Sequence, residues 1–257
     1  MWDAAVDLLL GSRCAGCSTP GRVLCPACAR ALVTRPSVSW PDPRPPVLTA
    51  ADVPPYAGAS YADVLRRLVV AYKDEQRSGL AMPLGRALAA VVEHAMVETA
   101  SDGAALPVAE LVPVPSTRAS VRRRGRDPVV ELARCAARRL RARGHQVQVR
   151  RRLRHRRTVL DQAGLGAGER AANLRGALSA RSAPPARSAP APLARFVVDD
   201  VITTGATADE AVRALLAAGW PVTAVAAVAA TRRWRLPGLA IRPMDCRGPG
   251  RGTSVST

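Results

Sequence analysis

The sequence predicts an α/β fold, with a mostly parallel sheet flanked by helices and a small four-cysteine module at the N-terminus. From about residue 57, apolar runs typical of buried strands alternate with segments of helical periodicity. This alternation favours a parallel sheet covered on both faces. Four cysteines in two closely spaced pairs precede that part of the chain. A length of 257 residues allows one domain of ordinary size and a small appendage.

Composition limits the core and suggests the kind of partner. Hydrophobic residues make up 48% of the chain and aromatic residues only 3%, so the core must consist of Ala, Val and Leu. The chain has 38 basic and 20 acidic residues, a net charge of +18. That charge fits a polyanionic partner, either nucleic acid or a phosphorylated small molecule. However, Lys73 is the only lysine, and an arginine excess is also expected from a GC-rich genome. Both interpretations stay open.

The sequence predicts a cytoplasmic protein without membrane insertion. The first residues carry two acids and no early basic residue, unlike a signal peptide. The longest nearly uncharged apolar run, at 222–230, is too short to span a membrane. In the cytoplasm, cysteines are expected as metal ligands or inert thiols rather than disulfides.

Residues 1–46 are expected to form an N-terminal module and a linker. A short amphipathic helix is predicted at 2–10, the cysteine segment follows at 14–28, and one more helical stretch is expected at 29–34. The prolines of the next segment, which continues to residue 47, exclude regular structure and mark a linker.

Residues 47–236 are expected to form the α/β domain. We predict strands at 109–115, 145–151, 195–200 and 222–231, and helices at 60–75, 79–99, 127–144, 166–178 and 206–219. Asp127 is the predicted N-cap of its helix, Pro128 stands in the first turn and Gly144 ends it. A Pro/Ala/Ser tract at 180–194 is expected to be a surface loop, and residues 237–257 an irregular tail.

The four cysteines follow the pattern C-x2-C-x7-C-x2-C, formed by Cys14, Cys17, Cys25 and Cys28. A two-residue spacer lets both thiolates of a pair reach one tetrahedral zinc ion at about 2.3 Å. Redox C-x-x-C motifs normally occur once, near a strand–helix turn, rather than twice in a short segment. We therefore expect a structural zinc site, because four thiolates leave no open position for catalysis.

An acidic pair, Asp199 and Asp200, ends a predicted buried strand and precedes a hydroxyl-rich loop. Ligands of open α/β sheets bind at the carboxyl ends of the strands. Two adjacent carboxylates can accept hydrogen bonds from vicinal hydroxyls such as those of ribose, and a nearby magnesium ion would offset their repulsion. The alternative is an acid pair that only caps a helix.

The loop that follows the acids is suited to a phosphate. It consists of Thr203, Thr204, Gly205, Ala206 and Thr207 and leads into a helix. Unpaired backbone N–H groups and the helix dipole form an anion site there, and the threonine hydroxyls add donors. Together with the acids, the loop predicts a sugar-phosphate site. In the alternative, Gly205 serves only a turn.

The stretch FVVDDVITTGAT at 196–207 resembles the phosphoribosyl pyrophosphate signature of type I phosphoribosyltransferases. The order of the cysteine knuckle, LVPVPSTRASVRRRGRD, LDQAGLGAGERAANLRGAL and this signature resembles the ComF family of competence-associated and GntX-like proteins. The resemblance covers residues 14–231. It implies a type I phosphoribosyltransferase-like fold in which magnesium accompanies phosphoribosyl pyrophosphate.

The resemblance also implies roles for individual residues. Asp199 and Asp200 correspond to the acids on the ribose hydroxyls, and residues 203–207 to the 5′-phosphate loop. The loop at 113–118 corresponds to the pyrophosphate site, for which the candidate cations are Arg118, Arg122, Arg123 and Arg124; arginine grips phosphate oxygens in pairs. The alternative for this arginine run is a solvated face.

A further segment matches the family pattern through Gln162, Leu165, Arg170, Asn173 and Gly176. By resemblance it belongs near the hood of the active site. The chain departs from the family at 126–127, where Arg-Asp replaces the usual Phe-Asn, so no ring can stack there. Thr203 stands where some purine transferases carry an acidic base, so no general base is expected in the loop.

Two functions remain open at this point, besides a purely structural fold without a ligand, against which the intact acid pair and Thr-Gly loop argue. The first is a phosphoribosyltransferase that binds phosphoribosyl pyrophosphate, or a related ribose phosphate, and transfers the phosphoribosyl group to an acceptor. The second is a non-enzymatic competence or DNA-uptake factor that binds single-stranded DNA, works with other DNA-processing proteins, and keeps the sugar-phosphate site as a regulatory pocket. The basic segments 118–126 and 150–157 are the expected DNA-binding rim, whereas the shortage of aromatics argues against base stacking.

Overall fold

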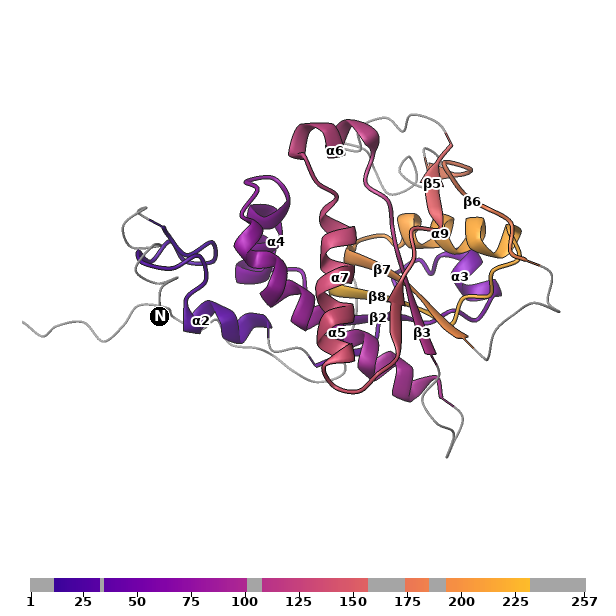
Figure 1. Cartoon of the computed structure of the whole chain (residues 1–257), viewed down its shortest axis with the longest axis horizontal. Helices are drawn as coiled ribbons and strands as arrows, with labels where there is room; N and C mark the ends of the chain where they lie inside the picture. Colours follow the sequence, from indigo (N-terminus) through magenta and orange to yellow (C-terminus); the bar gives the residue numbers. More distant parts are fainter. Residues whose placement is uncertain (1–11, 33–34, 101–107, 157–173, 185–192, 232–257) are drawn as a thin grey trace, which may run out of the picture.

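A computed structural model describes residues 12–32, 35–100, 108–156, 174–184 and 193–231 (Figure 1). In chain order the elements are α2 (Pro26–Ala29), the 3₁₀ turn η1 (Arg30–Leu32), β1 (Ser37–Val38), α3 (Pro46–Ala50), β2 (Pro55–Ser60), α4 (Asp63–Lys73), the 3₁₀ turn η2 (Ser78–Leu80), α5 (Ala81–Glu98), β3 (Val108–Pro113), α6 (Arg118–Arg124), α7 (Pro128–Arg141), β4 (Val147–Val149), β5 (Leu153–His155), β6 (Leu178–Ala180), β7 (Leu193–Ile202), α9 (Ala206–Ala217) and β8 (Ala224–Ala230).

The main sheet has the order β1-β2-β8-β7-β3-β4. The strands from β2 to β4 in this order are parallel to one another, and only β1 runs antiparallel at its edge. Strands β5 and β6 form a separate antiparallel pair. The predicted α/β fold with a mostly parallel sheet flanked by helices is therefore confirmed.

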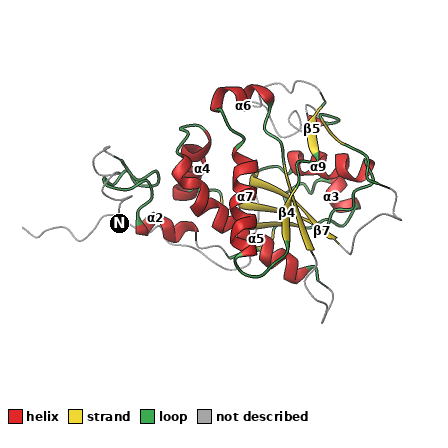
Figure 2. Cartoon of the chain, viewed as in Figure 1, coloured by secondary structure: helices red, strands yellow, loops and turns green. Residues whose placement is uncertain are grey.

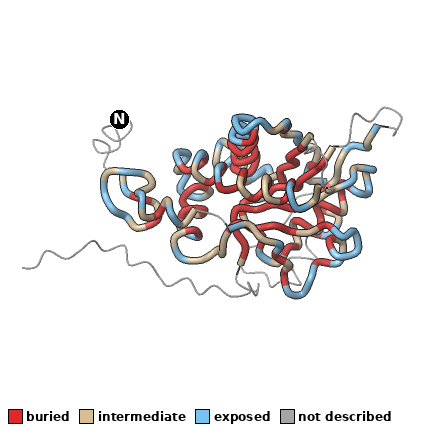
Figure 3. The backbone as a smooth tube through the Cα atoms, turned by 90° about the horizontal axis from the view of Figure 1, so that it is seen from below, coloured by how far each residue is buried: buried red, intermediate tan, exposed pale blue. Residues whose placement is uncertain are grey.

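Helices cover both faces of this sheet (Figures 1 and 2). On one face α4, α5 and α7 bury a large cluster of Leu, Val and Ala side chains. On the other face α9 and α3 bury a second, smaller cluster. The strands run through the buried interior (Figure 3), and every residue of β8 is buried. Strands buried on both faces have a continuous apolar sequence, which β8 shows along its whole length and β7 shows at 196–198.

The chain reverses its direction across the sheet between β3 and β7. From β3 it passes through α7 to β4, toward one edge, whereas from β7 it passes through α9 to β8, toward the other. Helices α7 and α9 lie on opposite faces (Figure 1). A crevice outside the carboxyl ends of the strands is expected at such a reversal, and it is the usual ligand site of open α/β sheets.

Residues 78–98, which span η2 and α5, are long and apolar enough to cross a membrane by length and composition alone. In the fold most of this segment is buried inside the protein. Its apolar side chains pack against β2, β8 and α7, as expected of the core helix of an α/β domain.

The predicted helices and strands of the α/β domain are observed where the structure describes them, except at the end of the helix expected at 166–178, where residues 175–176 form a turn and Leu178 begins β6. Helix α6 was not predicted. The segment at 35–47, predicted to lack regular structure, contains β1 and ends where α3 begins, since the prolines stand at a helix start and beside an edge strand. Strands β2, β5 and β6 were not predicted, because they are short or rich in small residues. The helix expected at 2–10, the tail at 237–257 and most of the helix expected at 166–178 lie outside the described residues, as do 185–192 of the predicted surface loop.

Candidate functional site

The acidic pair lies near the carboxyl end of β7, beside the end of β3. Val198 pairs with Pro113 across the two strands, and the backbone N–H of Val114 donates to the carbonyl of Val198 at 3.0 Å. Asp199 therefore stands next to the point where the chain leaves β3 for the loop at 113–118. Strand β7 continues to Ile202, so the acids lie within the strand rather than beyond it.

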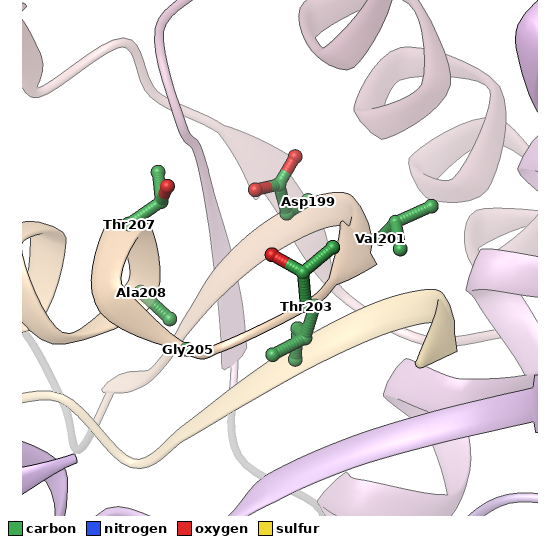
Figure 4. A pocket seen from close by; sticks show the side chains of 7 residues that line it. Asp199, Val201, Thr203, Gly205, Thr207 and Ala208 are labelled. Atoms are coloured by element: carbon green, nitrogen blue, oxygen red, sulfur yellow. The ribbon is translucent and has the colours of Figure 1, made fainter. Parts of the chain in front are cut away.

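The two acids face opposite sides of the sheet, as successive residues of a strand do. The Asp200 carboxylate is 3% exposed and forms an ion pair with Lys73 of α4 at 2.5 Å between Nζ and Oδ2. The Asp199 side chain lines a hollow next to α9 (Figure 4). Each carboxylate also accepts one backbone N–H, from Asp200 at 2.8 Å and from Val201 at 2.7 Å respectively.

This arrangement leaves two carboxylates beside one ammonium group. Burial, and then the neighbouring charge of Asp200, raise the pKa of Asp199 well above its ordinary value. Burial alone would lower the pKa of Lys73, but the carboxylates of Asp200 and Asp199 outweigh it, and the pKa is raised. Lys73 is therefore charged, and its single positive charge can neutralise only one of the two carboxylates.

Lys73 was not among the predicted site residues. It stands at the last position of α4, far from the acids in the sequence. Its signal was compositional: a single lysine in a chain whose other basic residues are all arginine. A compact ammonium fits one carboxylate in a narrow space, whereas a planar guanidinium needs room for its fork. The Lys73 ammonium offsets part of the repulsion between the acids.

The loop after β7 turns sharply at Gly205, which has a φ of +76° and is the N-cap of α9. A Cβ at Gly205 would come within 2.6 Å of Pro45 and 3.0 Å of Pro41, so only glycine fits the conformation and the space. The proline segment that was expected to be a linker therefore braces the loop from behind.

The loop and the acid together line a small hollow that is open to solvent. Its lining residues are Asp199, Val201, Ile202, Thr203, Gly205, Thr207 and Ala208. In Figure 4 the hydroxyls of Thr203 and Thr207 lie on the same side of the ribbon as the Asp199 carboxylate. Of the predicted loop residues, Thr204 and Ala206 do not line the hollow; the Thr204 hydroxyl accepts the Ala206 N–H at 3.4 Å. The start of α9 is thus combined with one carboxylate and two hydroxyls.

Asp209 holds the start of α9 in place. Its carboxylate accepts the backbone N–H groups of Val47 at 2.8 Å and Leu48 at 3.0 Å, at the beginning of α3. This contact joins the proline segment to the helix that carries the loop. Sequence reasoning missed it because the two partners are about 160 residues apart in the chain.

The arginines predicted for the pyrophosphate site lie on α6, directly after the loop at 113–118. Arg118, Arg122 and Arg123 are exposed, and none forms an ion pair with a residue that the structure describes. Arg124 differs, because its guanidinium pairs with Asp74 at 2.6 Å, next to Lys73. Helix α6 is therefore joined at its end to the region around the acids, and Arg124 is engaged inside the protein.

The two departures at 126–127 both have structural roles. Arg126 stacks on the ring of Tyr72, with 4.4 Å from its Cζ to the ring centroid, and forms an ion pair with Glu131. Asp127 is the N-cap of α7, as predicted. Its carboxylate also accepts the hydroxyl of Ser116 at 3.0 Å and so ties the loop after β3 to α7.

The predicted hood residues Gln162, Leu165, Arg170 and Asn173 lie outside the described residues. Their segment stands in the chain between β5 and β6. His155, at the end of β5, makes a hydrogen bond through Nε2 with the carbonyl of Pro115 at 3.0 Å. The β5–β6 pair is thereby attached to the loop that follows β3.

In the basic segment at 150–157, Arg150, Arg151, Arg154 and Arg156 are exposed, whereas Arg152 is not a free cation, which corrects the expectation for that residue. Its guanidinium holds the buried Glu110 through two hydrogen bonds of 2.5 Å, and Arg195 holds the same carboxylate at 2.7 Å. Both guanidinium groups lie over the ring of Trp220, at 3.5 and 4.8 Å. Arg151 and Arg154 also contact neighbours, at 3.9 Å from Asp127 and 3.3 Å from Ser179.

The four predicted cysteines come together. The sulfurs of Cys14, Cys17, Cys25 and Cys28 all lie within 4.8 Å of one another. Zinc–sulfur bonds of about 2.3 Å at tetrahedral angles require sulfurs about 3.8 Å apart, so the cluster fits a metal ion. Hydrogen bonds from the hydroxyl and then the backbone N–H of Thr19 lower the pKa of Cys17 to about 6, whereas burial raises the pKa of Cys25 and Cys28. The geometry of the four sulfurs, and not their pKa values, therefore supports the metal site.

The backbone of this cluster is as closely packed as its sulfurs. A Cβ at Gly16 would lie 2.6 Å from the sulfur of Cys28 and 3.0 Å from a methyl group of Val64. Glycine is therefore required where the first cysteine pair folds over the second.

A scan against protein-family models finds no match to this chain, and neither does a search of curated proteins. What the chain does has to be inferred from the two sites themselves, the hollow at the end of β7 and the four-cysteine cluster.

Proposed function

We propose that this chain binds a ribose phosphate, with phosphoribosyl pyrophosphate as the expected ligand, in the hollow at the end of β7. One observation supports the proposal above all. The acid pair, the Gly205 turn and the start of α9 meet where the chain reverses its direction across the sheet. The architecture and the residue chemistry select the same place independently.

Each part of the ligand has a matching group. The Asp199 carboxylate lines the hollow and can accept hydrogen bonds from the ribose hydroxyls. The 5′-phosphate fits the first turn of the twelve-residue helix α9, where backbone N–H groups and the helix dipole attract anions. The hydroxyls of Thr203 and Thr207 add donors there (Figure 4). In the proposal the fold is that of a type I phosphoribosyltransferase.

The pyrophosphate end of the ligand is assigned to the loop after β3 and to α6. Arg118, Arg122 and Arg123 are exposed on that short helix, and Lys73 lies between it and the acids. Magnesium bound with the ligand supplies further positive charge on the pyrophosphate. Cations aimed at a leaving pyrophosphate would support transfer of the phosphoribosyl group to an acceptor.

Calorimetry with ribose 5-phosphate, and with phosphoribosyl pyrophosphate plus magnesium, tests this proposal. Charge-assisted hydrogen bonds contribute about 1.5–3 kcal/mol each. We therefore expect Asp199→Asn with Asp200→Asn to weaken binding at least about tenfold. Asp63→Asn with Glu98→Gln removes the same charge from two exposed positions and should leave the affinity unchanged. Equal affinities for both double variants would contradict the assignment of the acids. Pyrophosphate release with an added base or amine acceptor would identify a transferase.

A second candidate function, binding of single-stranded DNA by a cytoplasmic competence or DNA-processing factor, is favoured by the exposed arginines of α6. Affinity for single strands falls with salt by about 0.7 logarithmic units per phosphate contact. Replacing Arg118, Arg122 and Arg123 by serine should then flatten the salt slope by about two units. Arg134→Ser with Arg139→Ser and Arg22→Ser, at exposed positions elsewhere, is the matched control. If both triple variants keep the wild-type slope, α6 is not a DNA-binding surface.

We also propose that the four cysteines hold one structural zinc ion. Apart from Cys14, Gly16 and Cys28, no described residue at 12–32 is buried, so the segment has almost no core of its own without the metal. Metal analysis should give about one zinc per chain, and Cys14→Ser should lower that content. A double Cys14→Ser, Cys17→Ser variant that keeps full zinc occupancy would overturn the assignment.

A further inference from the structure

Helix α4 is in contact with the four-cysteine module through its first half. The Arg67 guanidinium donates through Nε to the carbonyl of Gly16 at 2.5 Å, between the first two cysteines of the cluster. Val64, one turn earlier, lies against the same glycine. Just beyond α4, Arg77 donates to the carbonyl of Arg13 at 2.5 Å. The module therefore contacts both the first half of α4 and the segment just after its end.

The other end of α4 reaches the acid pair. Lys73, its last residue, forms the ion pair with Asp200 at 2.5 Å. The next residue, Asp74, pairs with Arg124 of α6 at 2.6 Å. An α-helix of eleven residues is a rigid rod about 16 Å long. A shift at its start therefore displaces the ammonium group at its end.

We propose that the metal-bound module positions Lys73 against Asp200 through α4, so that metal occupancy sets the net charge of the acid pair beside the hollow at the end of β7. The buried residues of the module are the glycine and two of the cysteines that surround the metal position. Loss of the metal removes the bonds that would join the four sulfurs around the Gly16 carbonyl and leaves the segment with a few backbone hydrogen bonds and partly buried side chains. Arg67 then loses its acceptor, and α4 loses one of its attachments.

The effect of the metal on the position of Lys73, transmitted through α4, is called the mechanical link, and it does not depend on the proposed function. The consequence for ligand binding does rest on the proposed function. Without Lys73 in place, the acid pair has no neutralising cation, with Asp199 lining the hollow and Asp200 on the opposite face of the strand. An anionic sugar phosphate then meets net repulsion at the acid pair. We therefore expect metal removal to weaken ribose 5-phosphate binding as well as to free Lys73.

The composition of the chain makes the mechanical link measurable without any ligand. Lys73 is the only lysine, so acetylation by an amine-reactive ester, mapped by mass spectrometry, reports on this one side chain. The rate is compared in zinc-loaded and chelator-treated full-length protein. We expect acetylation of Lys73 to be about threefold faster or more after metal removal, as expected when one contact of ordinary strength is lost. Cys135 is buried in the sheet domain and should stay protected from a thiol reagent, which shows that the domain remains folded.

Variants of two neighbouring arginines distinguish this link from a general loss of structure in the protein. Arg67→Ala should raise the acetylation rate in zinc-loaded protein by a similar factor and make it insensitive to the metal. Arg66, the exposed residue beside it, makes no contact with the module among the described residues, and Arg66→Ala should behave as wild type. If chelation exposes Cys135 as well, the Arg67→Ala result in loaded protein decides. Equal Lys73 rates in loaded wild type and Arg67→Ala would overturn the link. A link that holds while ribose 5-phosphate fails to bind would reject only the proposed function.

Discussion

Two charged clusters stand four residues apart on β7, and their balance of positive and negative groups is opposite. Around Arg195, one buried carboxylate of Glu110, 0% exposed, is shared by two guanidinium groups. Around Asp199 and Asp200, two carboxylates share a single ammonium, that of Lys73. The first cluster has an excess of positive charge inside the protein, and the second an excess of negative charge beside an open hollow.

The pKa shifts follow this difference. Burial alone would raise the pKa of Glu110, but the hydrogen bonds and charges of Arg152 and Arg195 outweigh it and lower the pKa. Burial and Asp200 together raise the pKa of Asp199. A carboxylate with a lowered pKa contributes stability, whereas one with a raised pKa costs stability at neutral pH. Strongly perturbed groups beside a cleft are candidates for function, while satisfied ones are structural.

The largest effect is expected from Glu110→Gln. The change leaves two guanidinium groups without their carboxylate, and removing one partner of a buried pair costs about 3 kcal/mol or more. Chemical denaturation should show that loss in the free energy of unfolding, while the exposed control Glu98→Gln should change it by less than about 0.5 kcal/mol. The wild-type contribution should be present above about pH 4.5 and decline as the pH falls through the lowered pKa of Glu110. If Glu110→Gln is as stable as wild type, the Glu110 cluster does not stabilise the fold and the contrast with the acid pair is wrong.

An intermediate effect is expected from replacing the exposed arginines of α6. Replacing Arg118, Arg122 and Arg123 by serine should weaken phosphoribosyl pyrophosphate binding by about tenfold, since each exposed cation contributes about 0.2–1 kcal/mol. Binding of ribose 5-phosphate, which lacks the pyrophosphate, should be unchanged. Calorimetry with both ligands separates the two ends of the hollow. An equal loss for both ligands would place the arginines outside the pyrophosphate site.

The smallest effect is expected from Asp199→Asn on stability. Because the pKa of Asp199 is raised in the folded protein, the wild type loses stability as the pH rises from the ordinary aspartate range, near 4, through the raised value. The asparagine variant escapes that loss and should be slightly more stable at neutral pH, although it binds ligand less well. Thermal unfolding from pH 4 to 8 tests this. A stability gain that is constant over that range would have another cause than the charge of Asp199.

Periodicity and cap residues predicted most of the α/β domain, because those signals are local. Asp127 before Pro128, and the buried runs of β7 and β8, each determine an element within a few residues. The four-cysteine cluster was predictable for the same reason. Strand β2 was not, since its PYAGAS sequence has no β-branched residue and is held by its place between β1 and β8.

The candidate site was predicted only as far as its residues are adjacent in the chain. The acids and the loop form one continuous string, whereas Lys73 reaches the acids from α4, and Asp209 joins the start of α9 to the distant α3. Arg152 was misjudged because its sequence neighbours suggest an exposed basic run, and its buried partner Glu110 is 42 residues away. Charge density along a sequence does not reveal which charges already have partners.

The packing of Gly205 also determines where this chain can be cut. Judged from its sequence, the sheet domain begins near residue 47, and a shortened protein would start there. Such a protein would lack Pro41 and Pro45, whose rings lie against Gly205. It would also lack β1, which completes one edge of the sheet. The sheet would keep nearly all its strands, but the turn at the start of α9 would lose its contacts with these prolines. Ligand binding by the shortened protein would therefore not represent binding by the whole chain.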